Sequence, residues 1–498
     1  MTSERPWWKG AVFYQIYPRS FLDTDGDGVG DLEGIRRKLP YLADLGVDAL
    51  WLSPIFTSPM ADFGYDVADF CDVDPLFGDL ADFNRMLAEA HDLGIRVIID
   101  FVPNHTSDQH PWFVDARSSR DSRHRDWYVW RDGTPDQPPN AWPAAFKPEP
   151  AWTWDEHTAQ WYLHLFLAEQ PDLDWSNPEV VEAMHGVLRF WLDRGVDGFR
   201  IDVVHLLGKE ITDSSYPEPS PRTHELMRGL RRLLDTYPGD RMLVGEVFIM
   251  STKKVVEFYG QDDELHLAFN FPPLFAPWDP AKWRKRIDRV VEEFDPRQAW
   301  PTWVLSNHDN PRHRTRYGSA ARARAACLLL LGVRGTPFLY AGEELGLEDA
   351  TIPPAAVVDP GGRDGCRAPI PWEAGPAHGW ATEKTWLPWP PGDSAAAQAV
   401  DTWSSLNLYR RALAVRRSSP ALAGGTFEWM PSPAEVLLWR RQSGDDTVVV
   451  AVNMGDDAAD LSPLAGAYSV EVASDGTDAG ATFAGVLAAS AAVWLRPL

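Results

Sequence analysis

The chain has 498 residues, 44% of them hydrophobic, which is enough for one large barrel domain with accessory domains and a sizeable core. Its formal net charge of -25 disfavours nucleic acid or an anionic membrane surface as a partner, since both carry phosphate, whereas a neutral substrate is compatible with it. The three cysteines form no CxxC pair, so neither a disulfide framework nor a zinc site is indicated.

The N-terminal residues and the longest apolar run contain no targeting or membrane segment. Residues 1–9 lack a long apolar stretch, so we expect no signal peptide. The apolar run over residues 325–333 is too short to span a bilayer and ends at Arg334. We therefore expect a cytoplasmic protein, either a monomer or a homodimer, without a nucleic-acid or membrane partner.

Short apolar runs alternate with amphipathic segments of helix length. Helices are expected over residues 32–45 and 80–93. Strands are expected over 11–17, 48–52 and 96–101, directly before Asp202 and Glu246, over 265–269, directly before Asp309, and over 337–340. This βαβ alternation is typical of a parallel sheet, and eight strands at this chain length favour an α/β fold of the (β/α)8 TIM-barrel type.

Two stretches interrupt the alternation. Residues 104–175 are rich in Pro, Trp, Asp and His and show little helix periodicity, which indicates a B subdomain inserted after the third strand. Beyond residue 420, short alternating runs such as Thr447–Val452 lie between Gly, Asp and Ser turns, which indicates a C-terminal antiparallel β-sandwich domain over 421–498. The catalytic barrel would then comprise residues 1–103 and 176–420.

An acidic loop follows the first expected strand. Asp23, Asp25, Asp27 and Asp31 occupy positions 1, 3, 5 and 9 of an EF-hand-like turn, and Val29 offers its carbonyl at position 7. The closing glutamate of a full EF-hand is absent. The spacing predicts a structural Ca²⁺ site, with a plain Asp/Gly turn as the alternative.

Three acidic residues stand at the ends of expected strands: Asp202, Glu246 and Asp309. In a barrel of this type the carboxyl ends of the strands converge on the active site, so the three side chains can meet in space. Two carboxylates that flank one bond are the nucleophile and the acid/base of a retaining glycosidase, and a third can stabilise the cationic transition state. Unrelated surface caps or ion pairs are the alternative for any one of them. Together they predict an enzyme that acts on a glycosidic bond.

Five ordered motifs resemble the α-amylase superfamily (glycoside hydrolase family 13), and within it the α-glucosidase and oligo-1,6-glucosidase branch. They are DFVPNH at 100–105, QPDLDW at 170–175, GFRID at 198–202, GEV at 245–247 and NHD at 307–309. Asp174 stands where this branch usually has Asn. The resemblance covers nearly the whole chain and implies the barrel, the B domain, the C-terminal β domain and retaining chemistry on α-glucosides.

The resemblance also implies roles for individual residues. Asp202 matches the nucleophile, which Arg200 would keep ionised, and Glu246 matches the acid/base, which needs a raised pKa. Asp309 would bind hydroxyls of the distorted sugar. The same ring would receive hydrogen bonds from two histidines, His105 and His308.

The resemblance extends to a second set of residues, and there it implies cleavage at a chain end. Asp62 would hydrogen-bond the non-reducing glucose and Tyr65 would stack beneath its ring. Either Arg363 or Arg367 would supply a second clamp, and the sequence leaves that choice open. A pocket closed by buried polar groups favours a terminal sugar, because an extended chain would leave those groups unpaired. A loop salt bridge between Asp62 and an arginine is the alternative.

The expected function is a retaining exo-α-glucosidase acting on small oligosaccharides or α-glucosides. Val203 follows the nucleophile, and in this branch Val at that position accompanies α-1,6 activity, although buried strands also use Val for packing. An α-glucosyltransferase or a sucrose isomerase-type enzyme with the same covalent intermediate is the rival. A catalytically inactive scaffold is disfavoured, because all three acids are present.

Overall fold

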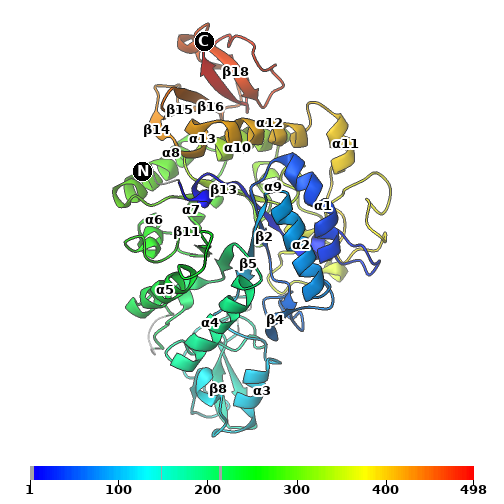
Figure 1. Ribbon diagram of the computed structural model, residues 1–498, viewed down its shortest axis with the longest axis vertical. Coiled ribbons are helices and arrows are strands. Elements are labelled where there is room, and N and C mark those ends of the chain that lie inside the picture. Colours follow the sequence, from blue (N-terminus) through cyan, green and yellow to red (C-terminus); the bar gives the residue numbers. More distant parts are fainter. Residues whose placement is uncertain (1–4, 147–148, 212–215) are drawn as a thin grey trace.

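The computed structural model describes residues 5–146, 149–211 and 216–498, so the first four residues of the N-terminal segment lie outside it. The centre of the molecule is a sheet of eight parallel strands (Figure 1). In chain order these are β1 (Phe13–Ile16), β2 (Ala49–Leu52), β5 (Arg96–Phe101), β9 (Gly198–Ile201), β10 (Met242–Gly245), β11 (Leu267–Ala268), β12 (Thr302–Val304) and β13 (Thr336–Tyr340).

The sheet closes because its first strand pairs with its last. β1 lies between β2 and β13, and the full order is β11-β10-β9-β5-β2-β1-β13-β12. At the seam between β11 and β12, the hydroxyl of Thr302 donates to the carbonyl of Ala268 at 2.8 Å and accepts from the N–H of Asn270 at 3.3 Å. The predicted TIM barrel is therefore confirmed.

Helices cover the barrel on its outside. They are α1 (Leu32–Leu45), α2 (Leu80–Asp92), α4 (Pro178–Leu192), α5 (Pro221–Leu234), α8 (Pro280–Phe294), α10 (Ala320–Gly332) and α12 (Ser405–Ser418), with shorter helices α6 (Thr252–Val255), α7 (Phe271–Leu274), α9 (His313–Tyr317), α11 (Ala395–Val400) and α13 (Pro420–Gly424) between them. α1 spans the predicted range, because Asp31 caps its start and Gly46, at φ 96°, ends it in a conformation that glycine adopts without strain.

Alternation along the strands decides which side chains fill the barrel. Phe13, Trp51, Ile98, Val244 and Phe338 belong to one buried cluster, and the rings of Phe13 and Phe338 stack at 4.5 Å. Because side chains point inward at every second position, the residues two further along the same strands also face the barrel interior, nearer its carboxyl end. The barrel therefore carries its polar residues above an apolar floor.

Two smaller units flank the barrel at opposite ends of the molecule (Figure 1). Between β5 and α4, the chain forms α3 (Pro111–Ser118) and an antiparallel sheet in the order β6-β8-β7, made of β6 (Trp130–Arg131), β8 (Gln160–Leu163) and β7 (Trp152–Asp155). A further antiparallel pair, β3 (Phe56–Thr57) with β4 (Asp69–Val73), follows β2. These segments extend the loops above the carboxyl ends of the strands.

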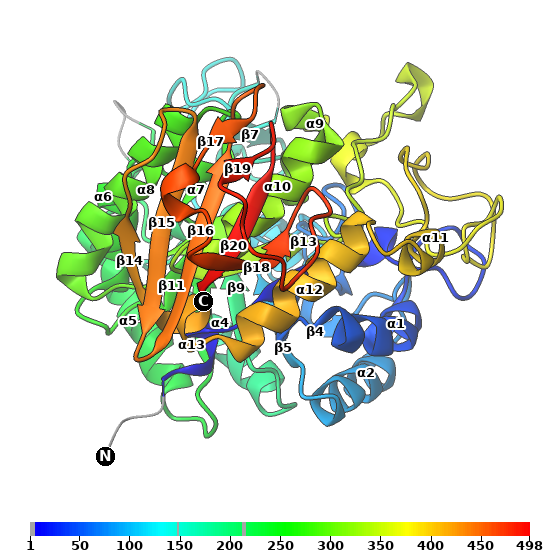
Figure 2. The ribbon, with the colours of Figure 1, turned by 90° about the horizontal axis from the view of Figure 1, so that it is seen from above.

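The C-terminal unit consists of two antiparallel sheets, as predicted. One has the order β14-β15-β16-β20-β18 and consists of β14 (Thr426–Trp429), β15 (Val436–Ser443), β16 (Asp446–Asn453), β20 (Ala492–Pro497) and β18 (Tyr468–Ala473). The other pairs β17 (Ala459–Asp460) with β19 (Val486–Leu487). Figure 2 looks down on this unit, with α12 running beside its strands.

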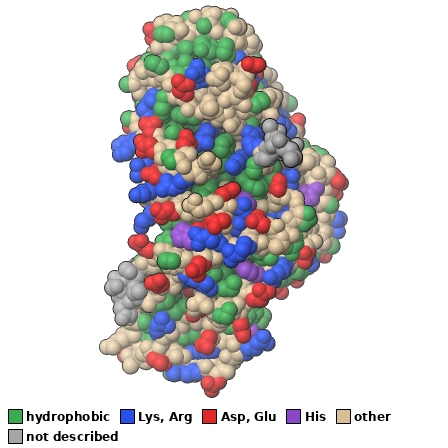
Figure 3. Space-filling model, turned by 60° about the vertical axis from the view of Figure 1, so that its left-hand side comes forward, with side chains coloured by type: hydrophobic (Ala, Val, Ile, Leu, Met, Phe, Trp, Pro, Cys, Tyr) green, Lys and Arg blue, Asp and Glu red, His purple; other side chains and the backbone are tan. Residues whose placement is uncertain are grey.

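Charge is mixed on the face that carries α5 and α8, where blue and red side chains alternate (Figure 3). Within the described ranges, no helix is both long and apolar enough to cross a bilayer.

Candidate active site

A cavity of ≈ 640 Å³ lies at the carboxyl ends of the barrel strands. All three predicted acids line it, and so do most of the predicted sugar-binding residues: Asp62, Tyr65, His105, Asp202, Val203, Glu246, Asp309 and Arg363. Asp202 and Glu246 follow the neighbouring strands β9 and β10, whereas Asp62 comes from the loop after β2 and Arg363 from the loop after β13. The barrel thus brings together residues separated by up to 301 positions in the chain.

Arg200 is the centre of the catalytic group. Its guanidinium is almost fully buried and donates from Nη1 to Asp100 Oδ1 at 2.6 Å and to Asp202 Oδ1 at 2.7 Å, and from Nη2 to Glu246 Oε2 at 2.6 Å. The N–H of Val203 donates to the same Glu246 oxygen at 3.1 Å. One positive charge therefore serves three carboxylates.

This shared charge modifies the expectation that Arg200 simply keeps Asp202 ionised. Burial raises the pKa of Asp202, Arg200 opposes that rise, and the nearby charges of Glu246 and Asp100 add to it. Burial also raises the pKa of Asp100 to about 6. Three carboxylates around one guanidinium favour retention of a proton within the group. The first step of a retaining glycosidase requires an ionised nucleophile, whereas burial favours a proton on Asp202 or Asp100 in this group.

The far end of the cavity is closed by a second charged network. Arg363 donates from Nη2 to Asp62 Oδ1 at 2.6 Å and to Asp359 Oδ1 at 2.6 Å, and from Nη1 to Asp309 Oδ1 at 3.1 Å. Arg367 is fully buried and donates to Asp309 and Asp359, both at 3.2 Å. Of the two candidate arginines, Arg363 faces the cavity and Arg367 supports it from behind. The alternative salt bridge of Asp62 is present too, within the cavity wall itself.

The charge states at this end follow from burial and from the two arginines. Burial raises the pKa of Asp62, and Arg363 and Arg367 counteract it. Burial acts to raise the pKa of Asp309, but the charges of Arg363 and Arg367 bring it below the ordinary value. Asp309 is therefore an anion that can accept hydrogen bonds from sugar hydroxyls.

The predicted histidines lie beside Tyr65. The Gln15 amide donates to His308 Nδ1 at 2.7 Å, so His308 Nε2 carries the proton and donates to the Tyr65 hydroxyl at 2.6 Å. The Tyr65 hydroxyl in turn donates to Asp100 at 3.2 Å. His105 Nε2 lies 3.1 Å from the carbonyl of Tyr65. Burial lowers the pKa of His308 to about 3 and that of His105 to about 4, so both rings are neutral donors at neutral pH.

Sequence reasoning missed several residues of the site. Asp100 stood in a recognised motif, but its place beside Arg200 was not anticipated, although it lies two positions after the inward-facing Ile98. Asp359 precedes Arg363 by four residues, a spacing that an acidic side chain can use for an ion pair. Phe146 lies 4.5 Å from the Arg363 guanidinium, and nothing in its aperiodic segment pointed to that contact.

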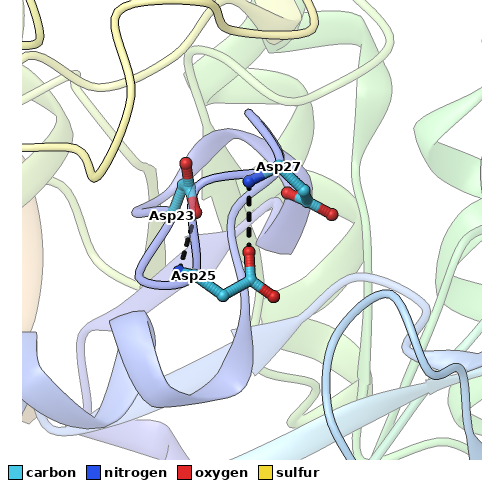
Figure 4. Close-up of side chains that lie close together, drawn as sticks. All are labelled: Asp23, Asp25 and Asp27. Atoms are coloured by element: carbon cyan, nitrogen blue, oxygen red, sulfur yellow. Dashed lines mark hydrogen bonds between the residues drawn. The ribbon is translucent and has the colours of Figure 1, made fainter.

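The acidic loop between β1 and α1 gathers three of the four predicted carboxylate ligands. Carboxylate oxygens of Asp23, Asp25 and Asp27 lie within 4.8 Å of one another (Figure 4). Asp31 instead caps α1, accepting from the N–H of Gly34 at 2.6 Å and from Thr24. Three clustered carboxylates are hard oxygen donors of the kind that Ca²⁺ prefers, so the residues present fit this ion.

Known proteins resemble this chain over nearly its whole length. Residues 15–425 match the family model described as alpha amylase, catalytic domain. The chain is 41% identical to a probable alpha-glucosidase of Rhizobium meliloti, over 92% of this chain and 91% of that protein. It is 34% identical to the oligo-1,6-glucosidase of Parageobacillus thermoglucosidasius, over 91% of each.

Two solved structures also superpose on nearly the whole chain, but their names describe activities other than that of a glucosidase. The alpha-glucosyl transfer enzyme XgtA superposes with a TM-score of 0.89 at 39% identity. The trehalulose synthase MutB of Pseudomonas mesoacidophila superposes with a TM-score of 0.90 at 32% identity. Each alignment covers 99% of this chain and 100% of the other.

Proposed function

This chain belongs to the α-amylase family of glycoside hydrolases, and from that premise we propose that it is a retaining, exo-acting α-glucosidase. It releases terminal α-linked glucose from small oligosaccharides or α-glucosides. The observation that carries this proposal is the pairing of Asp202 and Glu246 on one buried arginine, within a cavity whose far end is closed by Asp62, Arg363 and Asp309.

The reaction has two displacements at the same carbon. In the first, an oxygen of Asp202 attacks C1 of the glucose while Glu246 gives its proton to the departing glycosidic oxygen, leaving a glucosyl ester on Asp202. In the second, Glu246 takes a proton from water, the water oxygen attacks C1, and Asp202 departs as a carboxylate. Asp309 accepts hydrogen bonds from hydroxyls of the ring, and the neutral histidines fix the position of Tyr65 through their own hydrogen bonds to it.

The closed end supports cleavage at the chain terminus. Asp62 and Arg363 form the wall at this end, and the hydroxyls of a terminal glucose can hydrogen-bond to both side chains. A longer chain on that side would separate the pair and leave two buried charges unsatisfied, which is costly.

Transfer to another acceptor is the second candidate activity. It uses the same glucosyl ester, and a sugar or alcohol hydroxyl replaces water in the second displacement. The similarity to a transfer enzyme and to a trehalulose synthase supports this second candidate activity. Val203 lines the cavity next to the nucleophile at φ 35°, in position to influence the leaving sugar, and we propose that it favours α-1,6 linkages.

A structural calcium ion is part of the proposal. Asp23, Asp25 and Asp27, with the carbonyl of Val29, would hold it, and it would supply a cross-link within the loop that leads into α1 without taking part in the reaction. Asp31 would stabilise the loop without binding the ion, because it accepts hydrogen bonds from Thr24 and from the first turn of the helix. We further propose a cytoplasmic location, since all three cysteines are free, and either a monomer or a homodimer.

Initial rates on maltose, isomaltose, sucrose and trehalose test the proposed function, with glucose and new oligosaccharides both measured. If the enzyme is a hydrolase, each bond cleaved releases one free glucose from the non-reducing end. This glucose is first the α-anomer, because two displacements retain configuration. Release of β-glucose, or of fragments longer than glucose from the non-reducing end, would contradict it. Glucose appearing mainly on new products would favour the transfer activity.

A further inference from the structure

The cavity wall opposite Asp62 and Arg363 is built by the segments that follow β9 and β10. These are the fourth and fifth strands of the barrel, whereas Asp62 and Arg363 follow the second and the eighth. Residues 216–219 from one segment and Phe248, Ile249 and Lys254 from the other line the cavity. Because the Asp62 end is closed, the leaving group of a substrate must extend toward this wall.

An ion pair joins the two segments across that wall. Lys254 Nζ donates to Glu218 Oε2 at 3.1 Å, and the two side chains are 53% and 75% exposed. Both residues line the cavity. The mechanism above uses the other charged residues of the lining but has no role for these two.

Both partners stand on constrained backbone. Glu218 lies between Pro217 and Pro219, whose rings fix φ on either side of it. Lys254 belongs to α6, where the N-cap Ser251 accepts from its N–H at 3.4 Å. The pair therefore loses less chain entropy on closing than one between two freely moving loops.

We propose that the Glu218–Lys254 pair is a gate on the leaving-group side, which makes the enzyme prefer disaccharides and glucosides of small alcohols to longer oligosaccharides. This inference rests on the α-glucosidase activity proposed above. With the pair closed, a leaving group of one sugar unit is accommodated inside the cavity. A longer leaving group must pass between α6 and residues 216–219, and it is accommodated only when the pair opens.

The strength of an exposed ion pair sets the size of the effect. Pairs of this kind shift an equilibrium by up to about 5-fold, and salt weakens them. Discrimination against longer substrates is therefore modest and falls as ionic strength rises. Neutral sugars give this salt dependence no other direct electrostatic source.

The test compares Glu218→Gln, Lys254→Gln and the double variant with the unmodified full chain. For the linkage that the enzyme cleaves, kcat/KM is measured on the disaccharide and the tetrasaccharide at low and high NaCl. Each single variant is expected to raise the tetrasaccharide-to-disaccharide ratio by about 2- to 5-fold, and the double variant adds nothing further, because one interaction has been removed. Salt raises the ratio in the unmodified chain but not in the variants.

Glu225→Gln is the matched control. Glu225 pairs with Arg222 at 3.2 Å at similar exposure, but on α5 and away from the cavity lining. A ratio that stays constant in Glu218→Gln, or that rises equally in Glu225→Gln, overturns the gate. If the unmodified protein cleaves no α-glucoside at all, the proposed function fails and takes the gate with it; an active enzyme with an unchanged ratio loses the gate alone.

Discussion

At the scale of single residues, Arg200 determines how the site works. Its two nitrogens bind three carboxylates at 2.6–2.7 Å, so no single acid receives its full charge. As a result, burial raises the pKa of Asp202, although the proposed reaction needs this side chain ionised. Such a conflict between stability and chemistry is common where a catalytic group is buried before substrate arrives.

Asp202→Asn is expected to abolish turnover and to raise the melting temperature at pH 7. A carboxyl with a raised folded-state pKa binds its proton more tightly in the folded than in the unfolded chain, so stability falls as pH rises through that interval. The amide removes this penalty, while Arg200 keeps Asp100 and Glu246 as partners. Thermal melts from pH 4 to pH 8 check it: the gain over the parent protein should be largest at high pH and shrink as the pH falls toward the unfolded-state pKa of about 3.9.

Glu246→Gln is the companion variant for activity, since it removes the other carboxylate of the pair. An aryl α-glucoside with a good leaving group needs no proton, so it should retain far more activity than maltose. Equal losses on both substrates would contradict the assignment of the acid. Residual turnover by Asp202→Asn well above background would contradict the assignment of the nucleophile.

At the scale of elements, the loop between β1 and α1 shows how one motif divides its acids between two tasks. Asp23, Asp25 and Asp27 turn their carboxylates together, while Asp31 closes the loop onto the helix through Thr24 and Gly34. Like charges at this spacing repel one another, and burial with those neighbours raises the pKa of Asp27. A divalent cation would relieve that repulsion.

Calcium is therefore expected to raise the melting temperature relative to a chelator. At a free concentration 100 times the dissociation constant, binding to the folded state alone contributes about 2.7 kcal/mol. Asp25→Asn should abolish the difference between calcium and chelator. Asp121→Asn, at an exposed acid of the B subdomain, should retain it. Melting midpoints that coincide with and without calcium in the parent protein would refute the site.

At the scale of the whole molecule, Arg441 joins the C-terminal sheet to the barrel. It lies on β15, fully buried, and donates to the carbonyls of Gly332 at 2.9 Å, Thr426 at 2.8 Å, and Leu422 and Gly425 at 3.2 Å. Gly332 is the last residue of α10, so the guanidinium satisfies the end of a barrel helix. Burial lowers the pKa of Arg441, and the four carbonyls offset the cost of its desolvation.

Arg441→Met is expected to destabilise both units together. Gly332 and Leu422 keep hydrogen bonds from Trp439 and Arg416, whereas Thr426 and Gly425 lose the donor that Arg441 supplies. Since an unpaired buried carbonyl costs roughly 1–3 kcal/mol, the melting temperature should fall by several degrees in a single transition. Arg440→Met is the control, because the exposed pair of Arg440 with Glu428 should contribute little. A C-terminal unit that melted separately while the barrel kept its midpoint would show that this contact does not couple them.

The sequence by itself determined the architecture and which three acids meet in one cavity. Strand and helix periods are local properties of the chain, and the parallel strands they produce place their carboxyl ends on one face, so Asp202, Glu246 and Asp309 had to converge there. Only the tertiary structure decided that Arg363 and not Arg367 lines the cavity and that Asp359 pairs with both. Only the tertiary structure shows that Asp31 caps α1 and does not join the cluster of Asp23, Asp25 and Asp27. These outcomes depend on contacts between loops distant in the chain, where side-chain direction follows no period.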